Sequence, residues 1–383
     1  MKICLFALSN FLDVQGSTEP YYVYRHLKSR HEVIAVVPSS GERASPNQEI
    51  TFIRKVKGLP TFMSYNLLLI PSLVVGPFKD AHVIYTYKGA ITPVLALKFL
   101  MGKKWVCDFR TSPLAQELEF KKLQGTLTLG RRIAYSLARW FYKFTLPKCD
   151  LIVTLSQEIQ EELIQEYGVP AEKIFTLPLG VDLSLFSPKG LRPSIQESGL
   201  RLVYSGAIAP QRGLDTALQA LRLLKNSVPT RLVIIGRGPK ATIRYLQGFA
   251  QDLGVDKLIE WKGFIPHDRV PEVLDTCHIG LSPLPRLKAY EVSSPAKVVE
   301  YLAMGLAVVA TDIRAHRKVI HHEENGLLVP PGDPKALAQA LERLYNDPGL
   351  LSQIASRARE SAKPYSWDAL IEGLERRLRG LAH

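Results

Sequence analysis

The chain has 383 residues, of which 46% are hydrophobic, and a formal net charge of +13. This length suffices for two domains with apolar cores, and no apolar run is long and uncharged enough to span a bilayer. The positive charge favours an anionic partner, but nucleic acid is the weakest candidate because zinc-finger and RNA-recognition motifs are absent. The four cysteines are scattered, so we expect buried thiols and a reducing compartment rather than disulfides or zinc.

The first part of the chain is predicted to alternate strands and helices. Residues 2–8 form an apolar run without a small-residue cleavage site, which indicates a strand rather than a signal peptide. A polar loop ending in Gly16 and Ser17 leads to an expected helix at 18–29 and a strand at 31–37, a βαβ unit. Further strands are expected at 50–56, 82–87 and 105–110, with a helix at 90–101.

Two charged residues close the strand at 105–110. Asp108 and Arg110 fall at its carboxyl end, where parallel sheets place ligands. Arg110 is therefore a candidate to hold an acceptor or a phosphate. The alternative is that it pairs with Asp108 and braces the loop.

Residues 121–148 contain seven basic residues and no acidic one. On one predicted helical face lie the apolar residues Ile133, Leu137, Trp140, Phe141 and Phe144, and on another lie Arg132, Arg139 and Lys143. This pattern is typical of a helix lying on an anionic membrane surface. It equally fits a helix that packs its aromatic face on its own domain, and the two interpretations are not exclusive.

The next segment predicts the end of one domain and the start of another. A strand at 149–156 and a helix at 157–167, capped by Ser156, precede a strand at 173–178. Residues 187–199 are rich in Pro, Ser and Gly and are interpreted as a linker. We therefore predict domains at 1–185 and 186–383.

The second domain repeats the alternation. Strands are expected at 201–206, 232–236 and 259–263, the first two ending in Gly206 and Gly236. Residues 293–311 are predicted to form a loop, a helix that ends at Gly305 and a buried strand. The first turn of that helix presents free N–H groups suited to an anion. Lys297 and Glu300 project from one face, which suits a phosphate and a sugar hydroxyl, or forms only an ion pair on an ordinary helix. Helices at 334–346, 350–362 and 367–380 are expected to close the chain.

Several of these stretches match a known pattern. Residues 293–305 resemble S-x-P-x-K-x-x-E-Y-x-A-x-G, residues 178–182 resemble P-x-G-V-D, and residues 324–333 resemble E-N-G-L-L-V-x-P-G-D. These are signatures of retaining glycosyltransferases of family 4, and the resemblance covers most of the chain. It implies the GT-B architecture, in which two Rossmann-like α/β domains face each other across a cleft, and a last helix that often crosses back to the first domain.

The resemblance also implies roles for individual residues. Arg212 and Lys297 would hold the donor's diphosphate, Glu300 its ribose, and the backbone at Phe264 and Ile265 its base. Gly206 and Gly236 would lie in the donor loops. Near the acceptor and the reacting sugar, it implies Gly16, Ser17, Asp108 and Arg110. We take Arg212, Lys297 and Arg110 as the catalytic candidates.

Two departures from the family pattern concern the sugar and phosphate sites. Ala207 stands where the family carries arginine, and Val292 where the first glutamate of an E-x7-E motif is expected. Either Glu291 takes that role, or Ser293, Ser294 and the loop amides do.

The implied activity is hexosyl transfer from a nucleoside-diphosphate sugar to a glycan or lipid-linked acceptor. No metal or cofactor is expected, because the sequence lacks an Asp-X-Asp clamp. The implied location is the cytoplasm, with residues 121–148 as a candidate contact with the inner membrane face. Two alternatives stay open: a sugar-nucleotide epimerase of the same fold and a non-catalytic sugar-nucleotide-binding subunit.

Overall fold

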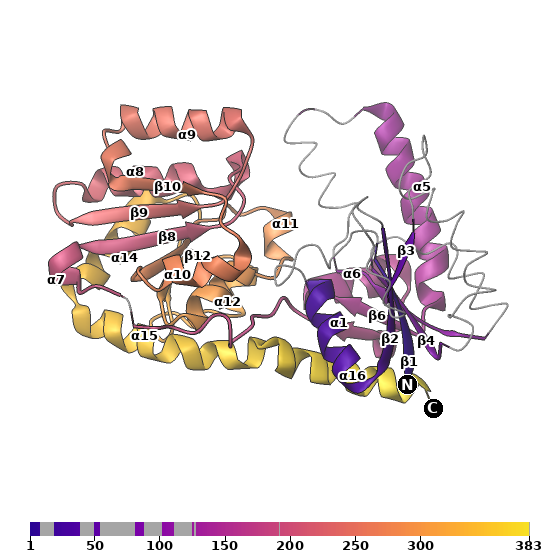
Figure 1. Cartoon of the computed structure of the whole chain (residues 1–383). Coiled ribbons are helices and arrows are strands. Elements are labelled where there is room, and N and C mark those ends of the chain that lie inside the picture. Colours follow the sequence, from indigo (N-terminus) through magenta and orange to yellow (C-terminus); the bar gives the residue numbers. More distant parts are fainter. Residues whose placement is uncertain are drawn as a thin grey trace. The chain divides into compact units, whose positions relative to one another are not determined.

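The computed structural model describes residues 1–7, 19–38, 50–53, 81–87, 102–110, 125, 128–190 and 192–382. These residues form two compact units, one of Met1–Pro178 with Trp367–His383 and the other of Leu179–Ser366. Each unit is built on one parallel sheet with helices packed against it (Figure 1). The predicted α/β class with two Rossmann-like sheets is confirmed.

The first unit contains a seven-stranded sheet in the order β3-β2-β1-β4-β5-β6-β7. Its strands are β1 Lys2–Phe6, β2 Glu32–Pro38, β3 Ile50–Ile53, β4 Val83–Tyr87, β5 Lys104–Asp108, β6 Leu151–Thr154 and β7 Ile174–Thr176. Its helices are α1 Glu19–Arg30, α5 Leu129–Thr145, α6 Gln157–Tyr167 and α16 Trp367–Ala382. The side chains of β4 are buried along its whole length, as expected of a central parallel strand. The helix predicted at 90–101 and the loop with Gly16 and Ser17 lie outside the described residues.

The second unit contains a six-stranded sheet in the order β10-β9-β8-β11-β12-β13. Its strands are β8 Leu200–Ser205, β9 Thr230–Ile235, β10 Ile259–Gly263, β11 Ile279–Ser282, β12 Ala307–Thr311 and β13 Leu327–Val329. Its longer helices are α8 Leu214–Leu224, α9 Lys240–Asp252, α12 Ala296–Ala303, α14 Pro334–Asn346 and α15 Pro348–Ala362. Short helices are α7 Ile195–Ser198, α10 Val270–Leu274, α11 Lys288–Glu291 and α13 Arg314–Arg317.

The core of the second unit lies on both faces of its sheet. Alternate residues of β8 take opposite sides: Leu202 and Tyr204 join a cluster with α8, α9 and α14, whereas Val203 joins one with α12 and α15. Two-sided burial explains why the central strands are apolar without alternation. Gly305 follows α12 with φ +64°, the left-handed conformation of a helix stop, as predicted.

The chain leaves the first unit earlier than the boundary predicted after residue 185. The amide of Val181 donates to the carbonyl of Tyr365 at 2.9 Å, and Phe186 is fully buried in a core of the second unit. The stretch interpreted as a linker is also tied to that unit, where Arg359 donates to Ser187 at 3.3 Å. The last helix, α16, belongs to the first unit.

A buried carboxylate holds α16 in place. Glu375 accepts hydrogen bonds from Arg30 at 3.0 Å, His31 at 2.9 Å and Arg379 at 2.7 Å. Burial alone raises the pKa of Glu375, but the bonds from Arg379, Arg30 and His31 outweigh it and lower the pKa to about 2. At the other end of the helix, Trp367 stacks on Tyr22 with ring centroids 5.0 Å apart.

Cys4, Cys107, Cys149 and Cys277 are buried free thiols, as predicted. Within the described ranges, no helix has both the length and the apolar character needed to cross a bilayer.

Candidate functional site

Lys297 lies in the first turn of α12, at the carboxyl edge of the second sheet. Its Nζ atom lies 3.8 Å from the centre of the Tyr204 ring and 3.1 Å from where a side-chain carbon on Gly206 would sit. The residue as a whole is partly exposed, but Nζ itself is buried. Among the described residues, none accepts a hydrogen bond from Nζ. A buried ammonium group without an acceptor is costly and points to a site for an anion.

The electrostatics of Lys297 follow from its surroundings. Burial and the nearby positive charge of Arg212 lower its pKa to about 7, and the carboxylate of Glu300 opposes that shift only partly. Arg212 ends the short 3₁₀ helix η3 Pro210–Arg212 and lies 5.1 Å from the centre of the Tyr290 ring. A diphosphate bound between Arg212 and Lys297 would stabilise both positive charges. Arg212 and Lys297 thus lie close enough for their charges to interact.

Glycine is required at two loops beside these cations. A side-chain carbon at Gly236 would sit 1.8 Å from the carbonyl oxygen of Gly206, and the two residues have φ of +151° and +140°. The loops after β8 and β9 therefore pack backbone against backbone. The absence of a side chain at Gly206 leaves room for Nζ of Lys297, which would lie 3.1 Å from a side-chain carbon there.

Glu300 lies one turn after Lys297 and is hydrogen-bonded to a histidine. Its Oε1 atom is 2.9 Å from Nε2 of His267, which begins the short helix η5 His267–Arg269. An ionised carboxylate only accepts hydrogen bonds, so its other oxygen can accept from sugar hydroxyls.

Phe264 and Ile265, predicted at the base-binding strand end, differ in burial. The Phe264 side chain is 60% exposed and lies 4.8 Å from the guanidinium of Arg237. Ile265 packs against the core. An exposed aromatic ring beside an arginine offers a stacking surface for a flat heterocycle.

The side chains proposed to replace the missing glutamate have local partners. Glu291 accepts from the amide of Arg314 at 2.7 Å, at the start of α13. Ser293 donates to the carbonyl of Tyr290 at 2.9 Å, and Ser294 accepts from the amide of Leu179 at 3.0 Å. Each of the three side chains therefore has a partner within the protein: Glu291 at the start of α13, and the two serines at backbone groups.

Arg110 and Asp108 form a buried charged cluster in the first unit. Nε of Arg110 lies 2.6 Å from Glu19 and 3.1 Å from Asp108, and its Nη1 donates to the carbonyl of Leu177 at 2.9 Å. Tyr85 donates to Asp108 at 2.8 Å, and burial raises the pKa of that carboxyl. These contacts fit the interpretation that Arg110 braces the loop after β5. The candidates Gly16 and Ser17 lie outside the described residues.

Helix α5 exposes an apolar stripe. Exposed fractions along it are 72% for Leu129, 54% for Ile133, 63% for Leu137, 70% for Trp140 and 57% for Phe144. The helical pattern placed Phe141 on the same face, but Phe141 is half-buried and contacts Tyr142. Tyr142 in turn contacts Phe109 and Tyr167. The view that Trp140 and Phe144 pack on their own domain is wrong, because most of each side chain is exposed.

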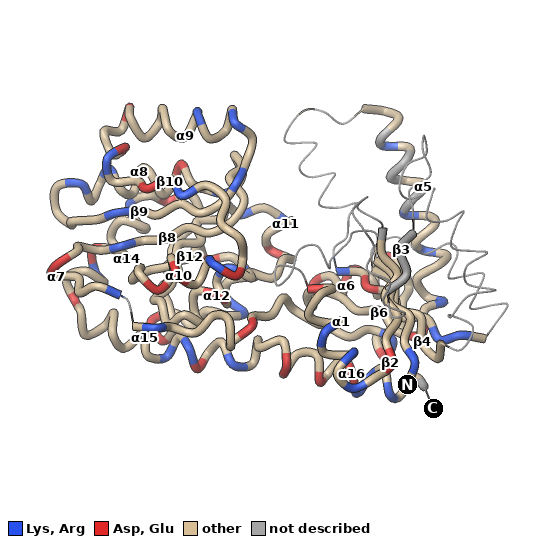
Figure 2. Tube along the Cα trace, in the orientation of Figure 1, with Lys and Arg blue, Asp and Glu red and all other residues tan. Residues whose placement is uncertain are grey.

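Basic residues are spaced along α5 (Figure 2). Arg132, Arg139 and Lys143 follow one another at helical spacing next to the apolar row. Arg139 pairs with Glu166 at 2.7 Å, and Lys148 lies 3.8 Å from the centre of the Phe144 ring. Of the predicted basic segment, residues 121–124 lie outside the described part of the chain.

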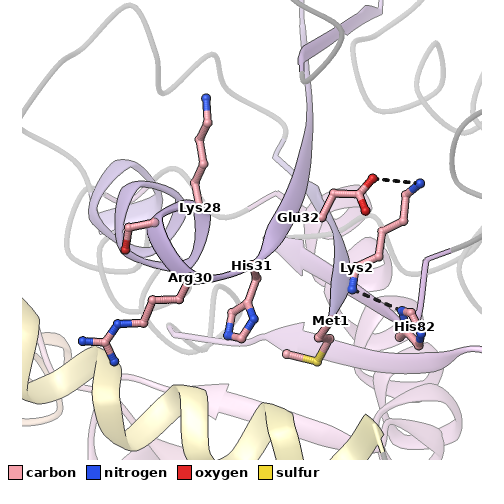
Figure 3. A pocket seen from close by; sticks show the side chains of 8 residues that line it. Met1, Lys2, Lys28, Arg30, His31, Glu32 and His82 are labelled. Atoms are coloured by element: carbon pink, nitrogen blue, oxygen red, sulfur yellow. Dashed lines mark hydrogen bonds and ion pairs between the residues drawn. The ribbon is translucent and has the colours of Figure 1, made fainter.

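A hollow of about 650 Å³ lies at the amino edge of the first sheet, opposite the carboxyl edge where Asp108 and Arg110 lie (Figure 3). Several cations line it, but Lys2 pairs with Glu32 at 2.9 Å, and Arg30 and His31 pair with Glu375. Because Lys2, Arg30 and His31 each have a carboxylate partner within the protein, these groups give no sign of an anion site. The described residues also contain no group of three or more His, Cys, Asp or Glu side chains that could hold a metal ion.

Sequence reasoning missed several partners of the site residues. Tyr204 and Tyr290 contact the two cations, and His267 contacts Glu300. Tyr204 was expected only as a strand residue, and Tyr290 lies outside the matched motif. His267 directly follows Phe264-Ile265-Pro266, so its closeness to the predicted base site was the available signal.

Comparisons with known proteins show the family to which the chain belongs. The pattern of Glycosyl transferases group 1 matches residues 199–347, and that of Glycosyltransferase Family 4 matches residues 21–185. The amylovoran biosynthesis glycosyltransferase AmsK of Erwinia amylovora is 30% identical over 324 residues, covering 81% of this chain and 74% of AmsK. The chain belongs to the group 1 and family 4 glycosyltransferases.

Solved structures share the fold across the whole chain. Sucrose-phosphate synthase from Thermosynechococcus elongatus has a TM-score of 0.78 at 18% identity, covering 99% of this chain and 98% of its own. Anabaena HepE in complex with UDP and glucose has a TM-score of 0.72 at 18% identity, covering 99% and 100%. At this identity the likeness shows the GT-B fold. For three other curated relatives, the matched region spans only 23 to 60% of their length.

Proposed function

We propose that the protein transfers a hexosyl group from a nucleoside-diphosphate sugar to a hydroxyl of a glycan or lipid-linked acceptor, with retention of configuration and without metal. The observation that carries this proposal is the buried Nζ of Lys297, which lacks a hydrogen-bond acceptor among the described residues and lies near Arg212. The binding of UDP and glucose by HepE and the role of AmsK in amylovoran biosynthesis support the donor and the polymeric acceptor.

In the proposed step, the bond between the anomeric carbon and the diphosphate oxygen breaks, and the electron pair leaves with the diphosphate. The acceptor oxygen forms the new bond on the same face, and its proton passes to the leaving phosphate. Arg212, Lys297 and the first amides of α12 stabilise the growing negative charge, the type of contribution that dominates many enzymatic barriers. Fixed cations at this place supply the charge that a metal ion supplies in other transferases.

A thermal-shift panel tests the proposal most broadly. UDP-, GDP-, ADP- and dTDP-sugars are added to the protein with and without EDTA. We expect at least one donor to raise the melting temperature by several degrees. Release of nucleoside diphosphate into water is followed in the same samples, and EDTA should leave both the shift and this release largely intact. A shift without release of nucleoside diphosphate would instead support the non-catalytic binding subunit, and a strict metal requirement would contradict the metal-free mechanism.

Replacing Glu300 with alanine should weaken donor binding at least tenfold, because hydrogen bonds to charged groups contribute about 1.5 kcal/mol or more. Titration calorimetry with the nucleoside diphosphate identified by the panel measures this. Glu360→Ala serves as the control, because Glu360 is 67% exposed on α15 and pairs with Lys363. Equal affinity of Glu300→Ala and the wild type would place the ribose elsewhere.

We further propose that α5 rests on an anionic membrane surface, where a lipid-linked acceptor would reside. The exposed stripe supplies an apolar face, and Arg132 and Lys143 supply charge beside it. Each basic residue near an anionic bilayer contributes about 1 kcal/mol, and salt weakens that attraction.

Co-sedimentation with vesicles tests this location. We expect binding to anionic vesicles that falls at high salt, and a loss of at least tenfold in the double variant Trp140→Ser/Phe144→Ser. Tyr245→Ser on α9 is the matched control, since Tyr245 is also 63% exposed but belongs to the other unit. Equal, negligible binding to anionic and neutral vesicles would reject the membrane contact and leave the transferase proposal standing.

A further inference from the structure

The pair of His267 and Glu300 has a geometry that the family signatures do not assign. Nε2 of His267 lies 2.9 Å from Oε1 of Glu300, and the two side chains are 22% and 15% exposed. The imidazole also packs on Phe186, with ring centroids 5.1 Å apart. His267 is therefore held from one side by an aromatic ring and reaches the carboxylate from the turn that follows Phe264 and Ile265.

We propose that His267 is a positioning residue that holds the Glu300 carboxylate ready for the donor's ribose. This inference rests on the proposed function, because it assumes that Glu300 binds the ribose hydroxyls. An ionised carboxylate can only accept, so the imidazole nitrogen at Oε1 must be the donor. The neutral ring suffices for this bond.

The benefit of such a contact is pre-organisation. A glutamate side chain has several rotamers, and fixing one of them on binding costs free energy. His267 restrains the carboxylate through Oε1 before the donor arrives and leaves the second oxygen for hydroxyl groups. It also joins two parts of the donor site, because η5 follows the base-binding turn and Glu300 lies on α12.

A positioning role differs from a merely structural one in its dependence on the ligand. If His267 acts through Glu300, its removal matters only for nucleotides that carry ribose hydroxyls. If it only supports the turn at residues 264–267, its removal weakens every nucleotide to the same extent.

Titration calorimetry with UDP, ADP and GDP, each beside its 2′,3′-dideoxy counterpart, tests this on the full chain. We expect His267→Leu to weaken the ribonucleotide five- to tenfold and the dideoxynucleotide less than twofold. His267→Gln, which keeps an N–H donor, should recover most of the loss. The double variant His267→Leu/Glu300→Ala should bind no more weakly than Glu300→Ala alone. His321→Leu, at an exposed histidine of the same unit, is the control for histidine loss.

Equal losses for ribo- and dideoxynucleotides, or no loss at all, would overturn the positioning role while the donor site stands. Binding of none of the six nucleotides by the wild type would overturn the proposed function and this inference with it. Should His267→Leu fold poorly, His267→Gln is compared with the wild type on both nucleotide types. A loss of affinity in His267→Gln that is the same for ribo- and dideoxynucleotides would contradict the proposal.

Discussion

Replacing Lys297 with methionine should lower glycosyl transfer about 10²–10³-fold, the usual effect of losing one group that stabilises developing negative charge. The same variant should be as stable as the wild type or more stable, by about 1–2 kcal/mol, because an apolar side chain removes a buried ammonium that has no hydrogen-bond acceptor in the described part of the chain. Loss of function with gain of stability is expected only where a charge is kept for a ligand.

Denaturant unfolding at several pH values checks the stability half of this prediction. The lowered pKa of Lys297, about 7 against an ordinary 10.5, means that the folded protein binds fewer protons than the unfolded chain between these values. Wild-type stability should therefore rise with pH across that window relative to Lys297→Met. Lys335→Met, at an exposed position on α14, is the matched control and should show neither effect. A Lys297→Met variant that is clearly less stable would show that the ammonium has a structural partner.

The same pKa gives donor binding a direction with pH. A diphosphate beside Lys297 favours the charged form and raises its pKa, so binding takes up a proton above pH 7. Affinity should fall as pH rises through about 7, and the dependence should vanish in Lys297→Met.

Replacing Glu375 with glutamine should lower the free energy of unfolding at neutral pH by roughly 2–3 kcal/mol, because the buried carboxylate loses charged partners on α1 and α16. The folded pKa of about 2 against an ordinary 4.5 makes this stability fully present above about pH 4.5 and lost as pH falls toward 2. Wild type and variant should therefore converge in stability in acid.

Glu372→Gln is the control for Glu375→Gln. Glu372 lies on the same helix but is 58% exposed, and its Oε1 atom is 3.8 Å from Nη2 of Arg30, beyond hydrogen-bond distance. Such an exposed pair contributes about 0–1 kcal/mol. Chemical denaturation at pH 7 and pH 3 measures both variants. A Glu375→Gln variant as stable as Glu372→Gln at pH 7 would show that α16 is held by its apolar face alone.

Local patterns predicted much of the fold. The unbroken apolar run at 306–310 marked β12, Gly305 marked the end of α12, and Ser156 marked the start of α6, because each depends on neighbouring residues only. The unit boundary was predicted less well, since it depends on long-range contacts such as Val181 with Tyr365. The affiliation of α16 with the first unit depends on Glu375 and its distant partners in the same way.

The candidate site shows the same limit. The motif placed Lys297 and Glu300 on one helix, but nothing in the sequence showed that Nζ of Lys297 is buried against Tyr204 or that His267 reaches Glu300. The exposure of Trp140 and Phe144 could not be read from periodicity, because an amphipathic helix can turn its apolar face inward or outward.

Turnover followed by proton NMR tests the central claim most directly. UDP-, GDP-, ADP- and dTDP-linked α-hexoses are incubated with the wild type and with Lys297→Met, and the anomeric signals are recorded over time. With water as the acceptor, the account predicts that the wild type releases nucleoside diphosphate from at least one donor and that the α-hexose is the first anomer to appear, before mutarotation, while Lys297→Met is slower by about 10²-fold or more. A β-hexose that appears first would contradict retention, and equal rates for both proteins would contradict the diphosphate site at Lys297.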